Sequence, residues 1–357
     1  MADVLAVSHS SSPQISVYPW SASTGFGAKM GDPASAVGNY VRGNPAFTVA
    51  NDAIAVALSA SPRVNAYPWS AAGFGSKVSN PGTLPAGTGY SVAFAPAGDA
   101  VAVGHATSPR VSAYPWSGAG FGTKFDNPAT VPTGNGNDCA FSPAGDALAV
   151  THGTSPRISI YPWSGSGFGS KFANPATVPT GTGYGVAFTP AGDAVAVSHA
   201  TTPYISVYPW SGAGFGSKFS DPASLPAGRG YDVSFTAAGN AIAVTHYSSP
   251  FVTAYPWSVA GFGSKVADPA VLPSSYGQAG KFWASSAIAL AVFGSPFVQA
   301  YPWSVAGFGS MFSDPATLPA GQGRGVAFST YTAAPAANSS NVLINLYHSS
   351  NLYLDED

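Results

Sequence analysis

Short stretches of alternating apolar and polar residues, separated by turn residues, run through most of the chain. In the unit formed by residues 90–132, the alternation covers residues 91–94, 100–105 and 110–114, and each stretch ends at Pro, Gly or Asp. A fourth stretch, residues 120–125, ends at an Asn-Pro pair. A period of two between turn signals predicts β-strands joined by tight connections. Each unit is therefore predicted to form a four-stranded antiparallel meander.

The unit recurs seven times, and each copy is marked by the tetrapeptide Tyr-Pro-Trp-Ser. Successive copies are 46 to 49 residues apart. A fixed period in the forties, built from short strands and Gly/Pro turns, fits one blade of a β-propeller. We interpret the repeated tryptophans as structural residues that pack between blades. They are Trp20, Trp69, Trp116, Trp163, Trp210, Trp257 and Trp303.

The two ends of the chain predict how the ring closes. Residues 3–30 supply only the second, third and fourth strands of a blade, and residues 325–329 match the missing first strand. We therefore expect an all-β, seven-bladed propeller over residues 1–329, closed by pairing of its N- and C-terminal strands, which removes exposed sheet edges. Residues 330–357 are expected to be a C-terminal extension, either an extra strand or a tether.

Composition supports strands over helices and narrows the function classes. Charged residues make up 8% of the chain, Glu356 is the only glutamate, and the net charge is −2. This balance lacks the positive charge of a nucleic-acid-binding protein. No apolar run is long enough for membrane insertion, and the N-terminus does not read as a secretory signal. Cys139 is the only cysteine and reads as a small buried apolar residue.

Five histidines occupy one position, the end of the second strand. Equivalent positions on neighbouring blades should lie on the order of 10 Å apart, too far for one metal ion. Leu58 and Val292 fill the same position in the other two units. We expect partly buried imidazoles bonded to the nearby Ser/Thr-Pro turn, and no metal site. The histidines are His9, His105, His152, His199 and His246.

Six of the seven lysines follow the tripeptide Gly-Phe-Gly, and Met311 takes the seventh place. On outer strands they would form a wide belt, either solvated and paired with nearby Asp or Asn, or able to meet a large anionic surface. The lysines are Lys29, Lys77, Lys124, Lys171, Lys218 and Lys265.

The residue after the proline of the second turn changes around the ring. One arc is cationic and the next is aromatic, and both residue types are favoured at interfaces. The pattern is a candidate interaction patch, although drift at strand ends would also produce it. The patch consists of Arg63, Arg110, Arg157, Tyr204, Phe251 and Phe297.

Sequence signals for catalysis are sparse. The chain has no Gly-x-Ser-x-Gly or Walker motif and cannot pair two glutamates. Asp138 and Asp232, near the starts of axial strands, are the only acidic candidates. The sequence predicts no catalytic residue, no cofactor and no metal ligand, and thus a protein that is not an enzyme.

Two stretches resemble a known family. Residues 186–197 (Val-Ala-Phe-Thr-Pro-Ala-Gly-Asp-Ala-Val-Ala-Val) and 205–210 (Ile-Ser-Val-Tyr-Pro-Trp) resemble the first three strands of a WD40-type blade, although the Trp-Asp pair and the Gly-His dipeptide are absent. The combination of Tyr-Pro-Trp-Ser with Gly-Phe-Gly-x-Lys resembles propeller-repeat proteins of tailed, especially marine, phages. The resemblance covers roughly residues 1 to 329.

This resemblance implies a non-enzymatic structural or interaction protein. We expect a virion component, either capsid-decorating or associated with the tail or fibres, made in the host cytoplasm and bound to other virion proteins. The alternative is an adhesin module that binds a host-surface glycan through aromatic residues such as Tyr204 and Phe251. A propeller hydrolase is the third hypothesis.

Overall fold

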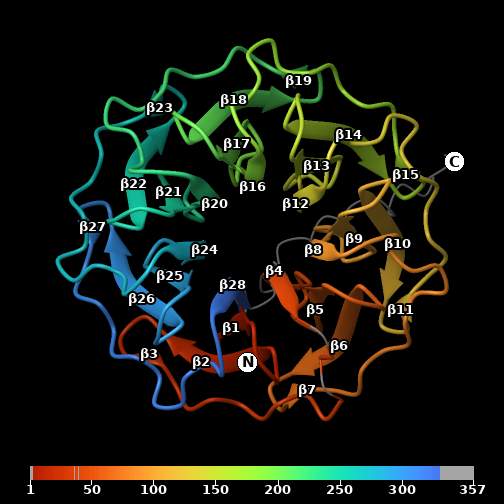
Figure 1. Cartoon of the computed structure of the whole chain (residues 1–357), viewed down its shortest axis with the longest axis horizontal. Helices are drawn as coiled ribbons and strands as arrows, with labels where there is room; N and C mark the ends of the chain where they lie inside the picture. The colour runs from red at the N-terminus through yellow and green to blue at the C-terminus, as the bar shows by residue number, and fades with distance from the viewer. Residues whose placement is uncertain (1–2, 36, 39, 330–357) are drawn as a thin grey trace, which may run out of the picture.

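The chain forms a ring of seven four-stranded antiparallel sheets around a central axis (Figure 1). The computed structural model describes residues 3–35, 37–38 and 40–329, so the predicted C-terminal extension lies outside the described residues. Strands and turns make up this part of the chain, and it contains no helix that could cross a membrane. The predicted seven-bladed propeller is confirmed.

The first two strands of each blade lie closest to the axis. The first strands are β4 (Val41–Phe47), β8 (Gly89–Phe94), β12 (Gly136–Phe141), β16 (Gly183–Phe188), β20 (Gly230–Phe235), β24 (Gly277–Trp283) and β28 (Gly323–Ser329). The second strands are β5 (Ala53–Leu58), β9 (Ala100–His105), β13 (Ala147–His152), β17 (Ala194–His199), β21 (Ala241–His246), β25 (Ala287–Val292) and β1 (Val4–His9).

The outer two strands carry the Tyr-Pro-Trp-Ser and Gly-Phe-Gly motifs. The third strands are β6 (Val64–Ser70), β10 (Val111–Ser117), β14 (Ile158–Ser164), β18 (Ile205–Ser211), β22 (Val252–Ser258), β26 (Val298–Ser304) and β2 (Ile15–Ser21). The fourth strands are β7 (Gly73–Phe74), β11 (Gly120–Phe121), β15 (Gly167–Phe168), β19 (Gly214–Phe215), β23 (Gly261–Phe262), β27 (Gly307–Phe308) and β3 (Gly25–Phe26).

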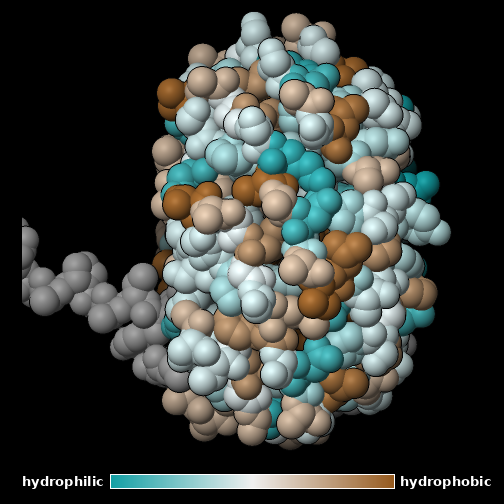
Figure 2. Space-filling view, turned by 90° about the vertical axis from the view of Figure 1, so that its left-hand side faces the viewer, coloured by the Kyte–Doolittle hydropathy of each residue, from teal (hydrophilic) through white to brown (hydrophobic). Residues whose placement is uncertain are grey.

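The fourth strands are shorter than the alternation predicts. In the third blade the expected strand over residues 120–125 is reduced to two residues, because Pro115 lies opposite Gly122 in the ladder. The N–H of Gly122 donates to the carbonyl of Pro115 at 2.8 Å, but proline has no N–H with which to return a hydrogen bond. The fourth strands at the rim are therefore short. Figure 2 shows apolar and polar residues intermixed over one side of the molecule.

The ring closes in the blade shared by the two ends of the chain. Strand β1 pairs antiparallel with β28, with Val4 opposite Ser329 and Val7 opposite Val326. The sheet order is β28-β1-β2-β3, which confirms the predicted closure.

The core lies between neighbouring blades. In the cluster between the second and third blades, Trp116 packs against Ala55 and Ala66 of the preceding blade and Val101 of its own. Its ring also meets Phe121 edge-on, with the ring centroids 5.1 Å apart. Small alanines on one sheet receive large side chains from the next, so each blade completes the core of its neighbour. The seven repeated tryptophans are 5–8% exposed.

Every first strand has a shift in register near the same end of the ring. In β4 the shift lies between Arg42 and Ala46, and Gly43 has a φ of +66°. A Cβ atom on Gly43 would come 2.2 Å from the carbonyl oxygen of Tyr90. The irregular backbone thus positions Arg42 and Asn44 at the end of the axis.

Replacing Gly43 with alanine is expected to lower the free energy of unfolding by about 2 kcal/mol or more, because the strained φ adds to the contact with Tyr90. Urea unfolding followed by tryptophan fluorescence measures the change. Gly118→Ala is the matched control, since nothing lies within 4 Å of its Cβ position. Equal stability of the two variants would contradict this account of the bulge.

Candidate functional site

A pocket of about 230 Å³ opens at one end of the propeller axis. It is lined by the beginnings of the seven first strands, so every blade contributes to one concave site. Such convergence of polar groups in a concave site is typical of small-molecule binding. The lining residues are Tyr40, Arg42, Gly43, Asn44, Tyr90, Asn137, Asp138, Tyr184, Gly185, Tyr231, Asp232, Gln278, Ala279 and Arg324.

The lining varies where the rest of the repeat is constant. In six blades the variable side chain follows the glycine that opens the first strand, and in the second blade Arg42 follows Val41. This variation within a repeated frame is the sequence signal from which the position of the pocket could have been predicted. The six residues are Tyr90, Asn137, Tyr184, Tyr231, Gln278 and Arg324.

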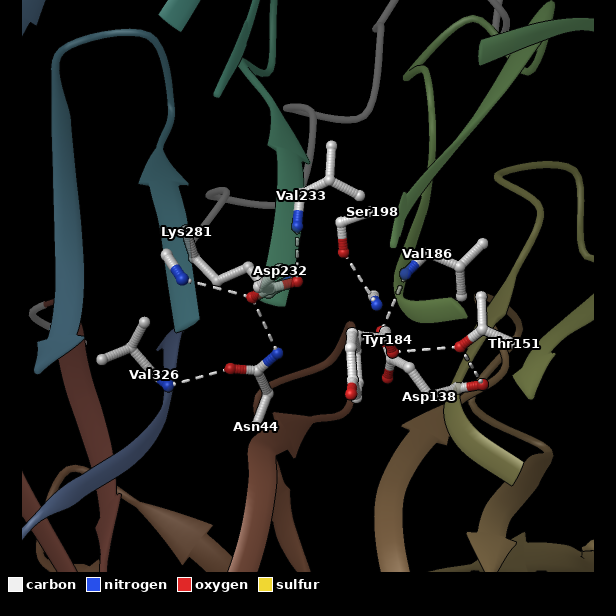
Figure 3. A network of polar contacts seen from close by, with 12 residues as sticks. Asn44, Asp138, Thr151, Tyr184, Val186, Ser198, Asp232, Val233, Lys281 and Val326 are labelled. Atoms are coloured by element: carbon white, nitrogen blue, oxygen red, sulfur yellow. Dashed lines mark hydrogen bonds and ion pairs between the residues drawn. The ribbon is translucent and has the colours of Figure 1, made fainter. Parts of the chain in front are cut away.

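The buried carboxylate of Asp232 lies at the centre of a polar network across the axis (Figure 3). It accepts hydrogen bonds from the N–H of Val233 at 2.8 Å and of Gly280 at 3.2 Å, and from Lys281 Nζ at 3.0 Å. Asn44, four blades earlier in the chain, donates to it at 3.1 Å. Four donors therefore bond one carboxylate, and the bond from Asn44 links it to the opposite part of the ring.

Asn44 completes the bridge on its other side. Its Oδ1 accepts the N–H of Val326 at 3.0 Å, so one amide links β28, β4 and β20 (Figure 3). A side chain that joins strands on opposite sides of the ring spans the axis. Both residues line the pocket, so the bridge crosses the axis within the site.

Asp138 is the second acidic residue of the pocket, and it lacks a cationic partner within 4 Å among the described residues. Its oxygens accept the N–H groups of Cys139 at 2.9 Å and Val186 at 3.0 Å. Burial raises the pKa of Asp138 to about 7, Lys281 opposes this rise, and the negative charge of Asp232 adds to it. At neutral pH this carboxyl exists in both protonation states and can accept or donate a proton.

An aromatic arc forms part of the pocket rim. The rings of Tyr184 and Tyr231 are 5.6 Å apart, those of Tyr231 and Tyr276 are 5.9 Å apart, and Tyr276 stacks on Phe293 at 4.7 Å. Arg229 lies 5.9 Å from the centre of the Tyr184 ring. Flat apolar faces beside polar groups suit a ligand with both ring carbons and hydroxyl groups.

The candidate interaction patch lies at the second turns, on the same face as the pocket but outside its lining. Each of the six residues has a positive φ, for example +73° at Arg110 and +69° at Tyr204. The carbonyl of Arg110 accepts the N–H of His105 at 2.8 Å, and its guanidinium donates to Asn135 at 3.2 Å. The structure spreads these residues around the ring, and their role as a patch stays a prediction.

The lysine belt lies on the rim, where each side chain bonds a residue three positions later in its own blade. Lys29, Lys218 and Lys265 pair with aspartates, and Lys77, Lys124 and Lys171 bond asparagine oxygens. The structure therefore shows local partners for all six lysines, and contact with an anionic surface stays a prediction.

The five histidines are fully buried, which corrects the expected partial burial. The Nε2 atom of His105 bonds Ser112 Oγ on the third strand at 3.0 Å, and the other four histidines make the equivalent bond. The expected bond to the turn is present at His152, whose Nδ1 lies 2.8 Å from the carbonyl oxygen of Thr154. Burial lowers the pKa of each histidine to about 4. No group of three His, Cys, Asp or Glu residues among the described ones could hold a metal ion.

The ring resembles solved propellers described as lactonases. Periplasmic gluconolactonase from Pseudomonas aeruginosa has a TM-score of 0.72 at 14% identity, over 92% of this chain and 99% of that chain. A candidate 6-phosphogluconolactonase from Bacteroides uniformis has a TM-score of 0.72 at 13% identity, over 92% and 99%. Another candidate 6-phosphogluconolactonase, from Bacteroides fragilis, has a TM-score of 0.73 at 10% identity, over 92% of this chain and 98% of that chain. At these identities the likeness establishes a shared fold.

Searches at the level of sequence gave no match. No protein-family model matches the chain. No curated protein matches it either. The resemblance to WD40-type blades therefore holds for the seven-bladed architecture, while membership of the WD40 family and a relationship to phage propellers have no support.

These comparisons correct three expectations from the sequence. The prediction of a non-enzymatic virion component, with its adhesin alternative, is contradicted because the similar structures are described as gluconolactonases. The prediction that the chain is not an enzyme is contradicted for the same reason. The expected virion location is contradicted by the periplasmic neighbour. The repeated motifs lie on the outer strands, whereas the pocket is lined by residues outside these motifs. The expected partners stay untested.

Proposed function

We propose that this protein is a hydrolase that opens a small cyclic ester, a lactone, in the axial pocket. The observation that carries the proposal is the position of Asp138, a carboxyl with a pKa of about 7 on the wall of a pocket built by all seven blades. A general base works best when its pKa lies near the working pH. The fold shared with propellers described as gluconolactonases supports an ester of this kind.

The chemistry requires one water molecule and one proton acceptor. Ionised Asp138 takes a proton from water as the water oxygen forms a bond to the lactone carbonyl carbon. The ring C–O bond then breaks, and its oxygen takes the proton back from Asp138. Lactone and water become a hydroxy acid, and the carboxyl returns to its starting state.

The rest of the pocket suits this substrate class. The Asn44–Asp232 bridge stops a ligand from passing along the axis, and the volume of about 230 Å³ favours a small molecule over a polymer. The Tyr184–Tyr231 wall offers ring faces to the carbons of a cyclic substrate. The site can thus hold one small ring with its ester bond beside β12.

A panel of lactones tests the proposal. Proton release in weak buffer would be followed for five- and six-membered aldonolactones, both neutral and carrying a carboxylate or a phosphate, and for unsubstituted lactones, against the spontaneous rate. We expect accelerated hydrolysis of at least one aldonolactone, because the pocket lining is rich in polar groups. Rates equal to the spontaneous rates across the panel would overturn the proposal.

The acid limb of the pH–rate profile is expected to move in opposite directions in two variants. Lys281→Met removes a positive charge that lowers the pKa of Asp138, so the limb should move to higher pH. Asp232→Asn removes a negative charge that raises the same pKa, so the limb should move to lower pH. The profile of kcat/KM measures both shifts. Displacement of both limbs in one direction, or no displacement, would contradict the role of Asp138.

A further inference from the structure

Two arginines face the pocket on the side away from Asp138. The guanidinium of Arg324 lies 4.8 Å from the centre of the Tyr40 ring, and that of Arg42 lies 5.3 Å from the same ring. They come from the adjacent strands β28 and β4, whereas Asp138 comes from β12. Within residues 3–35, 37–38 and 40–329, the ion pairs within 4 Å involve lysines only. Each guanidinium also lies against a second ring, Arg42 at 5.2 Å from the centre of Tyr90 and Arg324 at 5.6 Å from the centre of Phe293, and neither has a carboxylate within 4 Å among the described residues.

Arg324 has hydrogen-bonding capacity that the described residues do not use. Its Nη2 donates to Gln322, but its Nε is buried with no hydrogen-bond partner. Burial and the neighbouring charge of Arg42 both lower the pKa of Arg324. A buried donor without a partner and a pair of like charges both cost free energy, and an anion in the pocket that contacts the two guanidinium groups would relieve both costs.

The charges of the whole disc point to the same ligand chemistry. All six arginines of the chain lie on the face that carries the pocket: Arg42, Arg63, Arg110, Arg157, Arg229 and Arg324. The first turns, at the other end of the strands, carry the four aspartates Asp52, Asp99, Asp146 and Asp193. The six arginines outnumber Asp138 and Asp232 of the pocket lining, and an excess of positive charge around a concave site draws anionic ligands toward it.

We infer that the ligand of this pocket carries a permanent anionic group, a carboxylate or a phosphate, held by Arg42 and Arg324. Planar guanidinium groups match both oxyanions, since each can offer two parallel N–H donors. The inference deepens the proposed function by naming the substrate class, an anionic lactone whose charged end lies by β28 and β4 and whose ester lies by Asp138. The anion subsite itself does not depend on whether hydrolysis occurs.

Titration calorimetry tests the subsite without using activity. Inorganic phosphate and acetate are the two probes, each titrated into wild type at low ionic strength and again in 0.5 M NaCl. Binding of phosphate alone would identify a phosphate monoester, and binding of acetate alone a carboxylate. Binding of both would identify a general oxyanion site. All three results support the inference, and affinity should fall in high salt.

Two variants and one matched control locate the binding. Arg324→Met and Arg42→Met should each weaken binding about tenfold or more, because each removes a charge-assisted contact. Arg157→Met is the control, since Arg157 shares the face but bonds the carbonyl of Gly153 in its own turn. It should change affinity less than about twofold. Circular dichroism checks that all three variants fold.

Two results would overturn the inference: no binding of either probe to wild type at millimolar concentration, or an equal loss in Arg157→Met. If calorimetry succeeds and the lactone panel shows no turnover, the anion subsite stands and the hydrolase proposal falls. If the lactone panel shows turnover and calorimetry shows no binding of either probe, the hydrolase proposal stands and the substrate is an uncharged lactone.

Discussion

Acidification from pH 7 to pH 4 is expected to unfold this protein in a steep transition. Five histidines are buried, and burial lowers each pKa from 6.5 to about 4. Between these values the unfolded chain binds protons that the folded chain does not, so stability falls as pH falls. Each histidine is worth about 3 kcal/mol over this range, and together they rival the ~5–15 kcal/mol that stabilises a typical protein.

Tryptophan fluorescence and circular dichroism across a pH series measure the transition, and its steepness should correspond to several protons. The chain provides its own control, because the second blade has Leu58 and Asn65 where the fifth has His199 and Ser206. The double variant His199→Leu/Ser206→Asn copies that pair and should unfold at lower pH. A transition identical to that of wild type would contradict the assigned cause.

Asp138→Asn is expected to lower kcat for lactone hydrolysis about 10²- to 10⁴-fold, the usual contribution of a general base. Asparagine keeps the shape of aspartate, and its single amide oxygen can still accept one of the two N–H groups, that of Cys139 or that of Val186, but it cannot take a proton from water. The change in KM should be small, because Asp138 is proposed to act on water rather than to hold the substrate. Steady-state kinetics at pH 7.5 measure both constants.

Asp126→Asn is the control for this variant, since Asp126 is an exposed acid on the rim of the neighbouring blade. It should leave both constants unchanged. An unchanged kcat in Asp138→Asn would show that Asp138 is not the general base. An equal loss of kcat in Asp138→Asn and Asp126→Asn would show that the effect does not come from the pocket.

The architecture was predictable because the sequence repeats it. Tyr-Pro-Trp-Ser sets the spacing, the tyrosine and tryptophan fill the space between blades, and residues 325–329 complete the blade that residues 3–30 begin. The short fourth strands were not predicted, because the return bond from Gly122 to Pro115 is a backbone contact with no side-chain pattern.

The pocket was only partly predictable. Asp138 and Asp232 were named as the only acidic candidates, and both line the site. The pairing of Asn44 with Asp232 joins residues 188 positions apart, which no local pattern reveals. The bulge at Gly43 adds one residue between Arg42 and the Ala-Phe ending of β4, so an alignment on that ending places Arg42 one position away from Arg324.

A crystal structure with a product aldonate that carries a second anionic group, a phosphate or a carboxylate, tests the central claim most directly, namely that the axial pocket is the site of ligand binding and reaction. The account predicts electron density within the lining, with the carbon that was the lactone carbonyl beside Asp138 and the second anionic group against Arg42 and Arg324. Density at another surface, with the axial pocket filled only by water at saturating aldonate, would contradict it.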